Sequence, residues 1–283
     1  MSAVDGQRGG AATSGRSAPA AIIMAAGKGK RMGSDLPKVL HEVGGRPMVA
    51  PVVEACRDAG CARIVLVVGH GQERVREVFR GADDVRFVEQ AEQLGTGHAV
   101  LCARDEFERE IAAGPGAADA FVLAGDGPLI RADTLATLLE THRSRGAAAT
   151  LATSVLDDPS GYGRVVRDGA GAFRAIVEEK NATDDQRAIR EVNPSYYCFD
   201  VASLFGALER VERDGVSGEY YVTDVPALLL ADGARVEVID AVPPEDVLSI
   251  NTPAQLAEVD RIYRSRAEAG GGAAAAASAP GKG

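Results

Sequence analysis

The first half of the sequence alternates between short apolar runs and segments with helical spacing, and this alternation constrains the fold more than any other feature. Residues 21–25, 63–68 and 120–124 are apolar runs of the kind found in buried parallel strands. Residues 48–59 and 133–145, which follow two of these runs, carry apolar side chains at helical spacing. This order predicts an α/β fold, with a Rossmann-like, mostly parallel sheet, helices on both faces and right-handed crossovers.

The second half of the sequence mixes the two patterns. Residues 149–155, 163–167 and 173–177 predict strands, and the last two of these predict a hairpin. Thr252, with Gln255 three residues later, has the capping-box pattern that begins a final helix. Further elements are expected at residues 73–79, 85–88, 96–110 and 224–231.

Both ends of the chain differ in composition from the centre. Residues 1–19 contain almost no large apolar side chain, and residues 269–283 are of low complexity. Segments of this kind bury too little apolar surface to offset the entropy lost on ordering. We therefore expect a disordered tail at each end and one folded domain over residues 20–268.

Charge and cysteine content narrow the classes of partner. The net charge of -10 argues against general binding of nucleic acid, which needs a basic face, but it is compatible with phosphate ligands held by local cations and amides. The four cysteines form no CxxC pair, which favours reduced thiols. No apolar run approaches the roughly 20 residues of a membrane span. We expect a cytoplasmic protein without a membrane or nucleic-acid partner, and the oligomeric state is left open.

The stretch AAGKGKRMGSDLPK, residues 25–38, is the most informative motif. It follows an apolar strand, so it leaves the sheet at the edge where α/β proteins bind ligands. Its glycines allow backbone amides to approach a phosphate, and its cations add charge-assisted donors. It matches neither the Walker pattern nor the dinucleotide fingerprint. A surface turn with basic residues is the alternative reading. The glycines are Gly27, Gly29 and Gly33, and the cations that add donors are Lys28, Arg31 and Lys38.

This stretch resembles the signature of sugar-1-phosphate nucleotidyltransferases, LAAGxGTRM followed by LPK, and within them the uridylyltransferase domain of the bifunctional bacterial GlmU family. Six further stretches match in the same order, so the resemblance covers roughly residues 21–260. They are QAEQLGTGHAV (90–100), LAGDGPLI (123–130), DDPSGYGRVVRD (157–168), IVEEKNATDDQRAIREVN (176–193), GEYYVTDV (218–225) and NTPAQLAEVD (251–260).

The resemblance implies a nucleotide-diphospho-sugar transferase type of fold with a smaller β-rich sugar-binding portion. It also implies a Mg²⁺-dependent reaction of UTP with N-acetylglucosamine 1-phosphate, giving UDP-N-acetylglucosamine and pyrophosphate by in-line attack on the α-phosphorus. The implied partners are these small-molecule substrates. The chain contains no hexapeptide repeats, so we expect it not to carry the acetyltransferase activity of the bifunctional family.

The resemblance also assigns roles to individual residues. The implied catalytic residues are Arg31, Lys38 and Asp126. The implied nucleotide-binding residues are Ala25, Ala26, Gly27, Lys38, Gln90, Gln93, Gly95 and Thr96. The implied sugar-binding residues are Gly163, Glu178, Asn193 and Thr223, and the implied metal ligands are Asp126 and Asn251. A glutamine amide can pair with both a donor and an acceptor on a uracil edge, which suits a pyrimidine.

Two departures from the family pattern leave alternatives open. Lys30 stands where the family usually has Thr or Ser, and Ser195 stands where it usually has Gly close to the sugar. One alternative is therefore the same reaction with another sugar 1-phosphate or nucleoside triphosphate. Another is a non-catalytic regulatory module that binds a nucleotide-sugar. None of the four histidines is assigned as a base, and His98 is expected to pack on its own helix.

Overall fold

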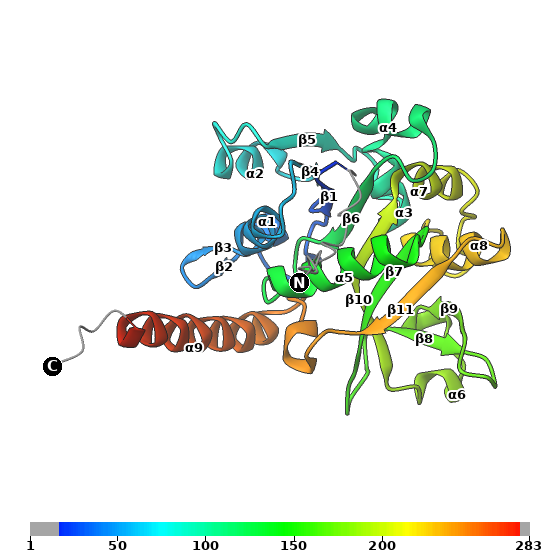
Figure 1. The fold of residues 1–283 in the computed structure, drawn as a ribbon. Helices are drawn as coiled ribbons and strands as arrows, with labels where there is room; N and C mark the ends of the chain where they lie inside the picture. Colours follow the sequence, from blue (N-terminus) through cyan, green and yellow to red (C-terminus); the bar gives the residue numbers. More distant parts are fainter. Residues whose placement is uncertain (1–16, 278–283) are drawn as a thin grey trace, which may run out of the picture.

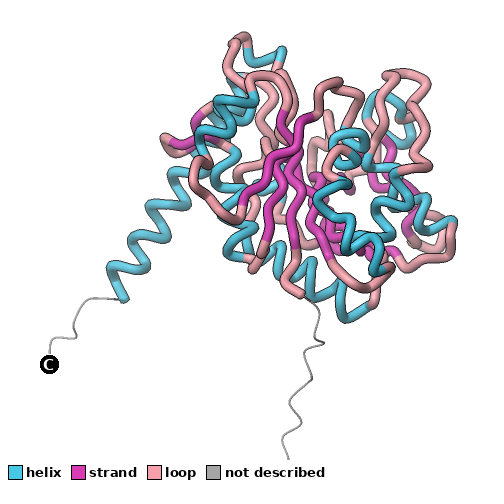
Figure 2. Tube along the Cα trace, turned by 90° about the horizontal axis from the view of Figure 1, so that it is seen from above, coloured by secondary structure: helices cyan, strands magenta, loops and turns pink. Residues whose placement is uncertain are grey.

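A mixed sheet forms the centre of the molecule (Figures 1 and 2). In residues 17–277, which this computed structural model describes, the sheet has nine strands. β10 runs antiparallel to both of its neighbours in the main path, whereas the other neighbouring strands there are parallel. The main path is β11 (Val236–Asp240), β7 (Ala149–Val155), β10 (Glu191–Asp200), β6 (Asp119–Ala124), β1 (Ala20–Met24), β4 (Arg63–Val68) and β5 (Val85–Glu89).

A hairpin attached to β10 forms the smaller β-rich portion. It consists of β8 (Gly163–Arg167) and β9 (Phe173–Val177), which confirms the hairpin expected from the sequence. β8 pairs with β10 so that Gly163 lies opposite Asn193. This register brings together two residues that the family pattern assigns to the sugar. A separate short hairpin joins β2 (Glu42–Val43) and β3 (Arg46–Pro47).

Helices cover both faces of the sheet, as the sequence predicts, because successive residues of a strand point to opposite faces. In β1, Ala21 and Ile23 belong to the core layer under α1, α5 and α9, whereas Ile22 belongs to the layer under α3, α7 and α8. The helices are α1 (Val49–Asp58), α2 (Gln72–Val78), α3 (Thr96–Leu101), α4 (Glu108–Ala113), α5 (Ala132–Arg145), α6 (Asp184–Arg187), α7 (Val201–Leu208), α8 (Val225–Ala231) and α9 (Pro253–Ala277).

The prediction of one continuous helix over residues 96–110 is wrong. After α3 the chain makes a short 3-10 turn at Arg104–Phe107, and α4 begins at Glu108. Phe107 is fully buried, and its ring centroid lies 5.6 Å from that of Phe205 on α7. Tertiary packing of this aromatic pair outweighs the local helical pattern, which is only a weak determinant of structure.

The final helix runs beyond the expected domain boundary. α9 continues to Ala277, so residues 269–277 of the expected tail are helical. In Figure 1 this helix extends away from the sheet. Residues 278–283 of that tail, and 1–16 of the expected N-terminal tail, lie outside the described residues.

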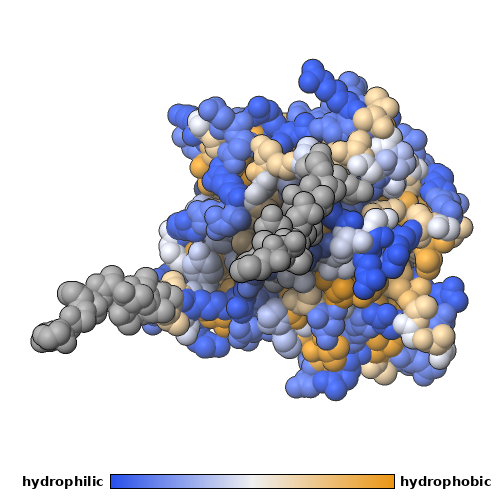
Figure 3. Space-filling view, viewed as in Figure 1, coloured by the Kyte–Doolittle hydropathy of each residue, from blue (hydrophilic) through white to orange (hydrophobic). Residues whose placement is uncertain are grey.

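The surface of the described chain carries few large apolar side chains. Val78, Val155 and Val216 are the exposed ones among residues 17–269, for which burial is described. In the face seen in Figure 3, hydrophilic residues predominate and hydrophobic residues form small patches. No helix in the described part of the chain is long and apolar enough to cross a membrane. The apolar side chains thus lie mainly in the two core layers.

Candidate active site

The loops at the carboxyl ends of β1 and β6 meet and form the centre of the site. The Ala25 amide donates to the Val67 carbonyl at 2.8 Å, and the Gly125 amide donates to the Met24 carbonyl at 3.0 Å. Further along the first loop, Gly29 has a φ of 62°, and a Cβ added there would lie 2.8 Å from the Cβ of Lys38. Glycine at this position therefore permits both the left-handed backbone and the close approach of Lys38.

Four predicted polar residues converge where these loops meet. The Lys38 ammonium donates to Asp126 Oδ2, and to Asn251 Oδ1 at 2.7 Å. An Nη of Arg31 donates to the same Asn251 oxygen at 2.9 Å. The four residues come from three segments far apart in the sequence. The structure thus brings together every residue that the family pattern assigns to catalysis or metal binding.

Two neighbouring residues hold Asn251 in place. Its amide N–H donates to Gln255 Oε1 at 2.9 Å, and its side-chain Nδ2 donates to Ser249 Oγ at 3.2 Å. The neighbouring Ile250 amide donates to the Asp126 carbonyl at 3.0 Å. The predicted capping box is half correct. The Gln255 amide donates to Thr252 Oγ1 at 3.3 Å, but Gln255 Oε1 accepts from the backbone amide of Asn251 and from the Thr252 hydroxyl, not from the Thr252 backbone amide. The start of α9 therefore orients a site residue.

A cavity of about 300 Å³ opens beside this cluster. Gly95, at its wall, has a φ of 106°, and a Cβ added there would lie 2.4 Å from the Tyr220 carbonyl oxygen, so only glycine fits. All eight residues expected to bind the nucleotide line this cavity, namely Ala25, Ala26, Gly27, Lys38, Gln90, Gln93, Gly95 and Thr96.

A second cavity, of about 190 Å³, adjoins the first. Three of the four expected sugar-binding residues, Gly163, Glu178 and Asn193, line it. The fourth, Thr223, does not, but its hydroxyl donates to Glu178 Oε1 at 3.0 Å. Burial raises the pKa of the Glu178 carboxyl, and the Thr223 hydrogen bond only partly offsets this. The two cavities share three wall residues, which are Ala124, Asp126 and Ser195.

Comparison with known families identifies the chain. The family model described as "MobA-like NTP transferase domain" matches residues 21–220. The chain belongs to this nucleotidyltransferase family. Its curated relatives include proteins named "Bifunctional protein GlmU", and the resemblance found in the sequence is thereby confirmed.

This nucleotidyltransferase is nearly half identical in sequence to three of these GlmU proteins. The protein of Heliobacterium modesticaldum is 46% identical over 246 residues, that of Geobacter metallireducens 46% over 250, and that of Pelotomaculum thermopropionicum 47% over 247. Each alignment covers 87% of this chain but only 52%, 51% and 52% of the respective relative. The chain thus spans about half the length of the curated relatives it matches.

Solved structures confirm the fold of this nucleotidyltransferase. A UDP-glucose pyrophosphorylase complexed with UDP-glucose superposes with a TM-score of 0.68 at 16% identity, covering 88% of this chain and 100% of that one. An apo UDP-glucose pyrophosphorylase gives 0.69 at 15% identity, covering 88% and 99%. The fold is therefore that of nucleotide-diphospho-sugar transferases, as the sequence resemblance implies.

The expected metal ligands form a sparse set of oxygens. Within residues 17–277, no three His, Cys, Asp or Glu side chains gather as a metal site. Asp126 and Asn251 nevertheless both direct a side-chain oxygen at one cation, the ammonium of Lys38. Magnesium sites in nucleotide enzymes often use one or two protein oxygens and complete the shell with phosphates and water. The donor set therefore fits a hard divalent cation, of which magnesium is one.

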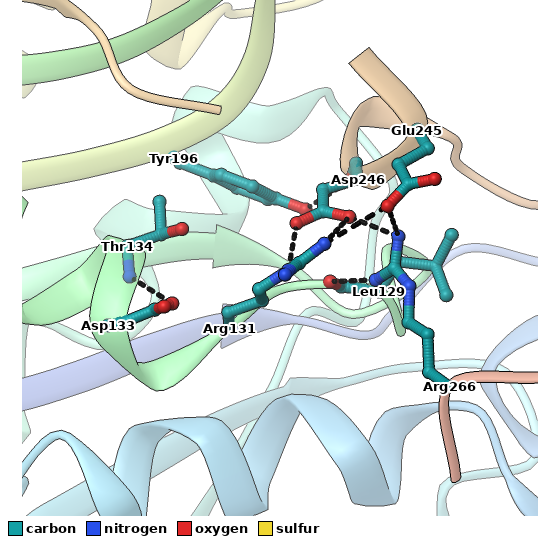
Figure 4. A network of polar contacts seen from close by, with 8 residues as sticks. All are labelled: Leu129, Arg131, Asp133, Thr134, Tyr196, Glu245, Asp246 and Arg266. Atoms are coloured by element: carbon teal, nitrogen blue, oxygen red, sulfur yellow. Dashed lines mark hydrogen bonds and ion pairs between the residues drawn. The ribbon is translucent and has the colours of Figure 1, made fainter. Parts of the chain in front are cut away.

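Beside the site lies a buried ion-pair network that sequence reasoning missed (Figure 4). Asp246, with 1% of its surface exposed, accepts from Arg131 Nε at 2.5 Å and from Arg266 on α9. Its carbonyl accepts from the Tyr196 hydroxyl at 2.9 Å. Arg266 also donates to the Leu129 carbonyl at 3.3 Å. The network joins α9 and β10 to the loop that follows Asp126, and no local sequence pattern marks it.

Proposed function

We propose that the chain transfers the uridylyl group of UTP to N-acetylglucosamine 1-phosphate, with release of pyrophosphate. The observation that carries this proposal is the arrangement of two adjoining cavities that share Asp126. One cavity collects the residues that the family pattern assigns to the nucleotide, and the other collects those assigned to the sugar. A sugar phosphate held in the second cavity would thus lie next to a triphosphate held in the first.

The proposed reaction needs alignment and charge neutralisation more than a base. A sugar phosphate oxygen is already anionic near neutral pH, so it can attack the α-phosphorus in line while pyrophosphate leaves. Lys38 and Arg31 bind the triphosphate and stabilise the charge that develops on its oxygens. Holding both substrates in neighbouring cavities supplies the orientation.

Asp126 and Asn251 would hold Mg²⁺. When bound, the ion would neutralise phosphate charge and help to align the reacting groups. Gln255 and Ser249 support this role, because Gln255 accepts from the backbone amide of Asn251 and Ser249 accepts from its side-chain nitrogen.

Glu178 and Asn193 are proposed to recognise the acetamido group and hydroxyls of the sugar. Asn193 is oriented for this purpose: its Nδ2 donates to the Tyr197 hydroxyl at 2.6 Å, and its Oδ1 accepts from the Ser195 amide at 3.3 Å. A site built to pair polar groups rejects substrates that leave those groups unpaired. N-acetylglucosamine 1-phosphate should therefore be used better than glucose 1-phosphate.

Ser195 favours a second candidate, the same reaction with another sugar 1-phosphate. Its side chain stands at the junction of the two cavities, where the family pattern has glycine. A hydroxyl at that point alters both the shape and the polarity of the sugar cavity.

The test is pyrophosphate release over a matrix of nucleoside triphosphates and sugar 1-phosphates, with and without Mg²⁺. We expect the highest rate with UTP, N-acetylglucosamine 1-phosphate and the metal, and no turnover after chelation. Asp126→Asn, which keeps the side-chain shape, serves as the inactive control. If the protein binds a UDP-sugar but releases no pyrophosphate under any condition, it is instead a non-catalytic regulatory module.

A further inference from the structure

The amide of Gln90, in the nucleotide cavity, has both of its hydrogens occupied by the protein. Its Nε2 donates to the Gly95 carbonyl at 3.0 Å and lies 3.1 Å from Nδ1 of His98. Only 3% of the surface of Gln90 is exposed. Both contacts are made by Nε2, so neither of them occupies the side-chain oxygen Oε1. Gln90 therefore has an acceptor, and no donor, left for a ligand.

The Gly95 carbonyl determines the orientation of the Gln90 amide, that is, which position its nitrogen occupies and which its oxygen. A carbonyl oxygen can only accept, so the atom facing it must be the Gln90 nitrogen and not the oxygen. The second amide hydrogen then points at His98, and Nδ1 of the imidazole has to accept it. His98 is thereby restricted to the neutral tautomer with its proton on Nε2.

The far side of His98 agrees with that tautomer. Its Nε2 lies 3.8 Å from Sγ of Cys102, one turn further along the chain, and a sulfur atom is a weak acceptor for the Nε2 hydrogen. The ring also lines a cavity of about 280 Å³ between α3 and the end of α7. His98 is thus bounded by Gln90 on one side and by open space on another, and changes to its side chain need not disturb a close-packed core.

We propose that His98 is a positioning residue that selects the nucleobase through Gln90. By taking the second amide hydrogen, it leaves the Gln90 carbonyl as the group presented to the base. Such an acceptor pairs with a ring N–H such as N3–H of uracil. Cytosine carries an unprotonated nitrogen at N3, which would oppose the Gln90 oxygen. This inference rests on the proposed function, which places the base against Gln90. It also changes the expectation from the sequence, because Gln90 offers the base only an acceptor and not both a donor and an acceptor.

A matched pair of substitutions at position 98 tests the proposal kinetically. His98→Asn can place an oxygen acceptor where Nδ1 stands, whereas His98→Leu has nearly the same shape without an acceptor. We expect His98→Leu to raise the KM for UTP by roughly tenfold, the size of one lost hydrogen bond, and to lower the preference for UTP over CTP. His98→Asn should have a KM for UTP and a preference for UTP over CTP close to those of the wild type. The kcat and the KM for the sugar phosphate should change little in either variant, because neither depends on the base.

Equal KM values for UTP and equal selectivity in the two variants would overturn the proposal, since only the acceptor distinguishes them. Thermal unfolding of both variants verifies that they are folded.

Imidazole nitrogen NMR spectra of the free protein, assigned with the His98→Asn variant, test the tautomer without any turnover. We expect an unprotonated Nδ1 and a protonated Nε2 for His98. A proton on Nδ1 at neutral pH contradicts the inference whatever the substrate is. If His98 has the expected tautomer but the protein does not turn over UTP, the proposed function is wrong, and so is the inference that Gln90 selects uracil.

Discussion

At the residue scale, Lys38 is the side chain on which the proposed mechanism depends most directly. It contacts both Asp126 and Asn251 and lines the nucleotide cavity, whereas Lys30, eight positions earlier, is exposed at the start of a short 3-10 turn. Lys38→Ala should lower kcat/KM by roughly 100- to 1000-fold, because a charge-assisted contact to developing phosphate charge is lost.

Lys30→Thr is the matched control, and steady-state kinetics with UTP should show a much smaller change. Similar losses in the two variants would contradict the ranking of these lysines.

Glu178 gives a prediction about pH. Burial raises its pKa above the ordinary value of 4.5, so the folded state binds this proton more tightly than the unfolded state. The free energy of unfolding therefore decreases as the pH rises from about the unfolded pKa through the raised folded pKa. Glu178→Gln removes this titration, and the variant should be more stable than the wild type at neutral pH. Urea unfolding across pH should show the difference shrinking as the pH falls through that interval, and a constant difference would contradict the assignment.

At the scale of elements, β10 carries local strain at the site. Ser195 has a φ of 66°, the one positive value for a non-glycine residue within residues 17–277, and it lies in the irregular register between Val192 and Tyr196. A left-handed backbone costs an L-residue roughly 1–2 kcal/mol, and glycine relieves that cost but loses more entropy on folding.

Ser195→Gly should therefore increase the free energy of unfolding by about 0.5–1 kcal/mol. Activity on the N-acetylated sugar phosphate should be unchanged or higher. Urea unfolding measures the first effect and steady-state kinetics the second, and destabilisation by glycine would show that the serine side chain stabilises the bulge.

The network of Figure 4 makes η6 (Pro244–Val247) part of the support for the site. Asp246→Ala leaves Arg131 and Arg266 without their buried partner. Because both arginines are partly exposed and also reach Glu245, we expect a loss of about 2 kcal/mol, less than for a fully buried pair.

Asp157→Ala breaks an exposed pair with Arg190 and should leave the urea midpoint unchanged. A midpoint for Asp246→Ala equal to that of the control would show that the network does not hold the elements together.

At the scale of the whole molecule, the sequence predicts what local periodicity encodes and misses what depends on long-range contact. Strands β1, β4, β5, β6 and β7, the hairpin and the start of the last helix follow from period and capping residues. Strands β10 and β11 and the break after α3 are not predicted, because the pairing of β10 with β6, the pairing of β11 with β7 and the burial of Phe107 involve partners distant in sequence. The same holds in the site, where the loop at Lys38 is recognisable but the contact of His98 with Gln90 is not.

The most direct test of the central claim is a competition between two sugar 1-phosphates. Purified protein receives UTP, Mg²⁺ and equal concentrations of N-acetylglucosamine 1-phosphate and glucose 1-phosphate, and mass spectrometry follows the two UDP-sugars over time. Because Glu178 and Asn193 are proposed to pair with the acetamido group and hydroxyls, UDP-N-acetylglucosamine should form far faster. Faster formation of UDP-glucose would contradict the amino-sugar assignment, and formation of neither product would contradict the proposed uridylyltransferase.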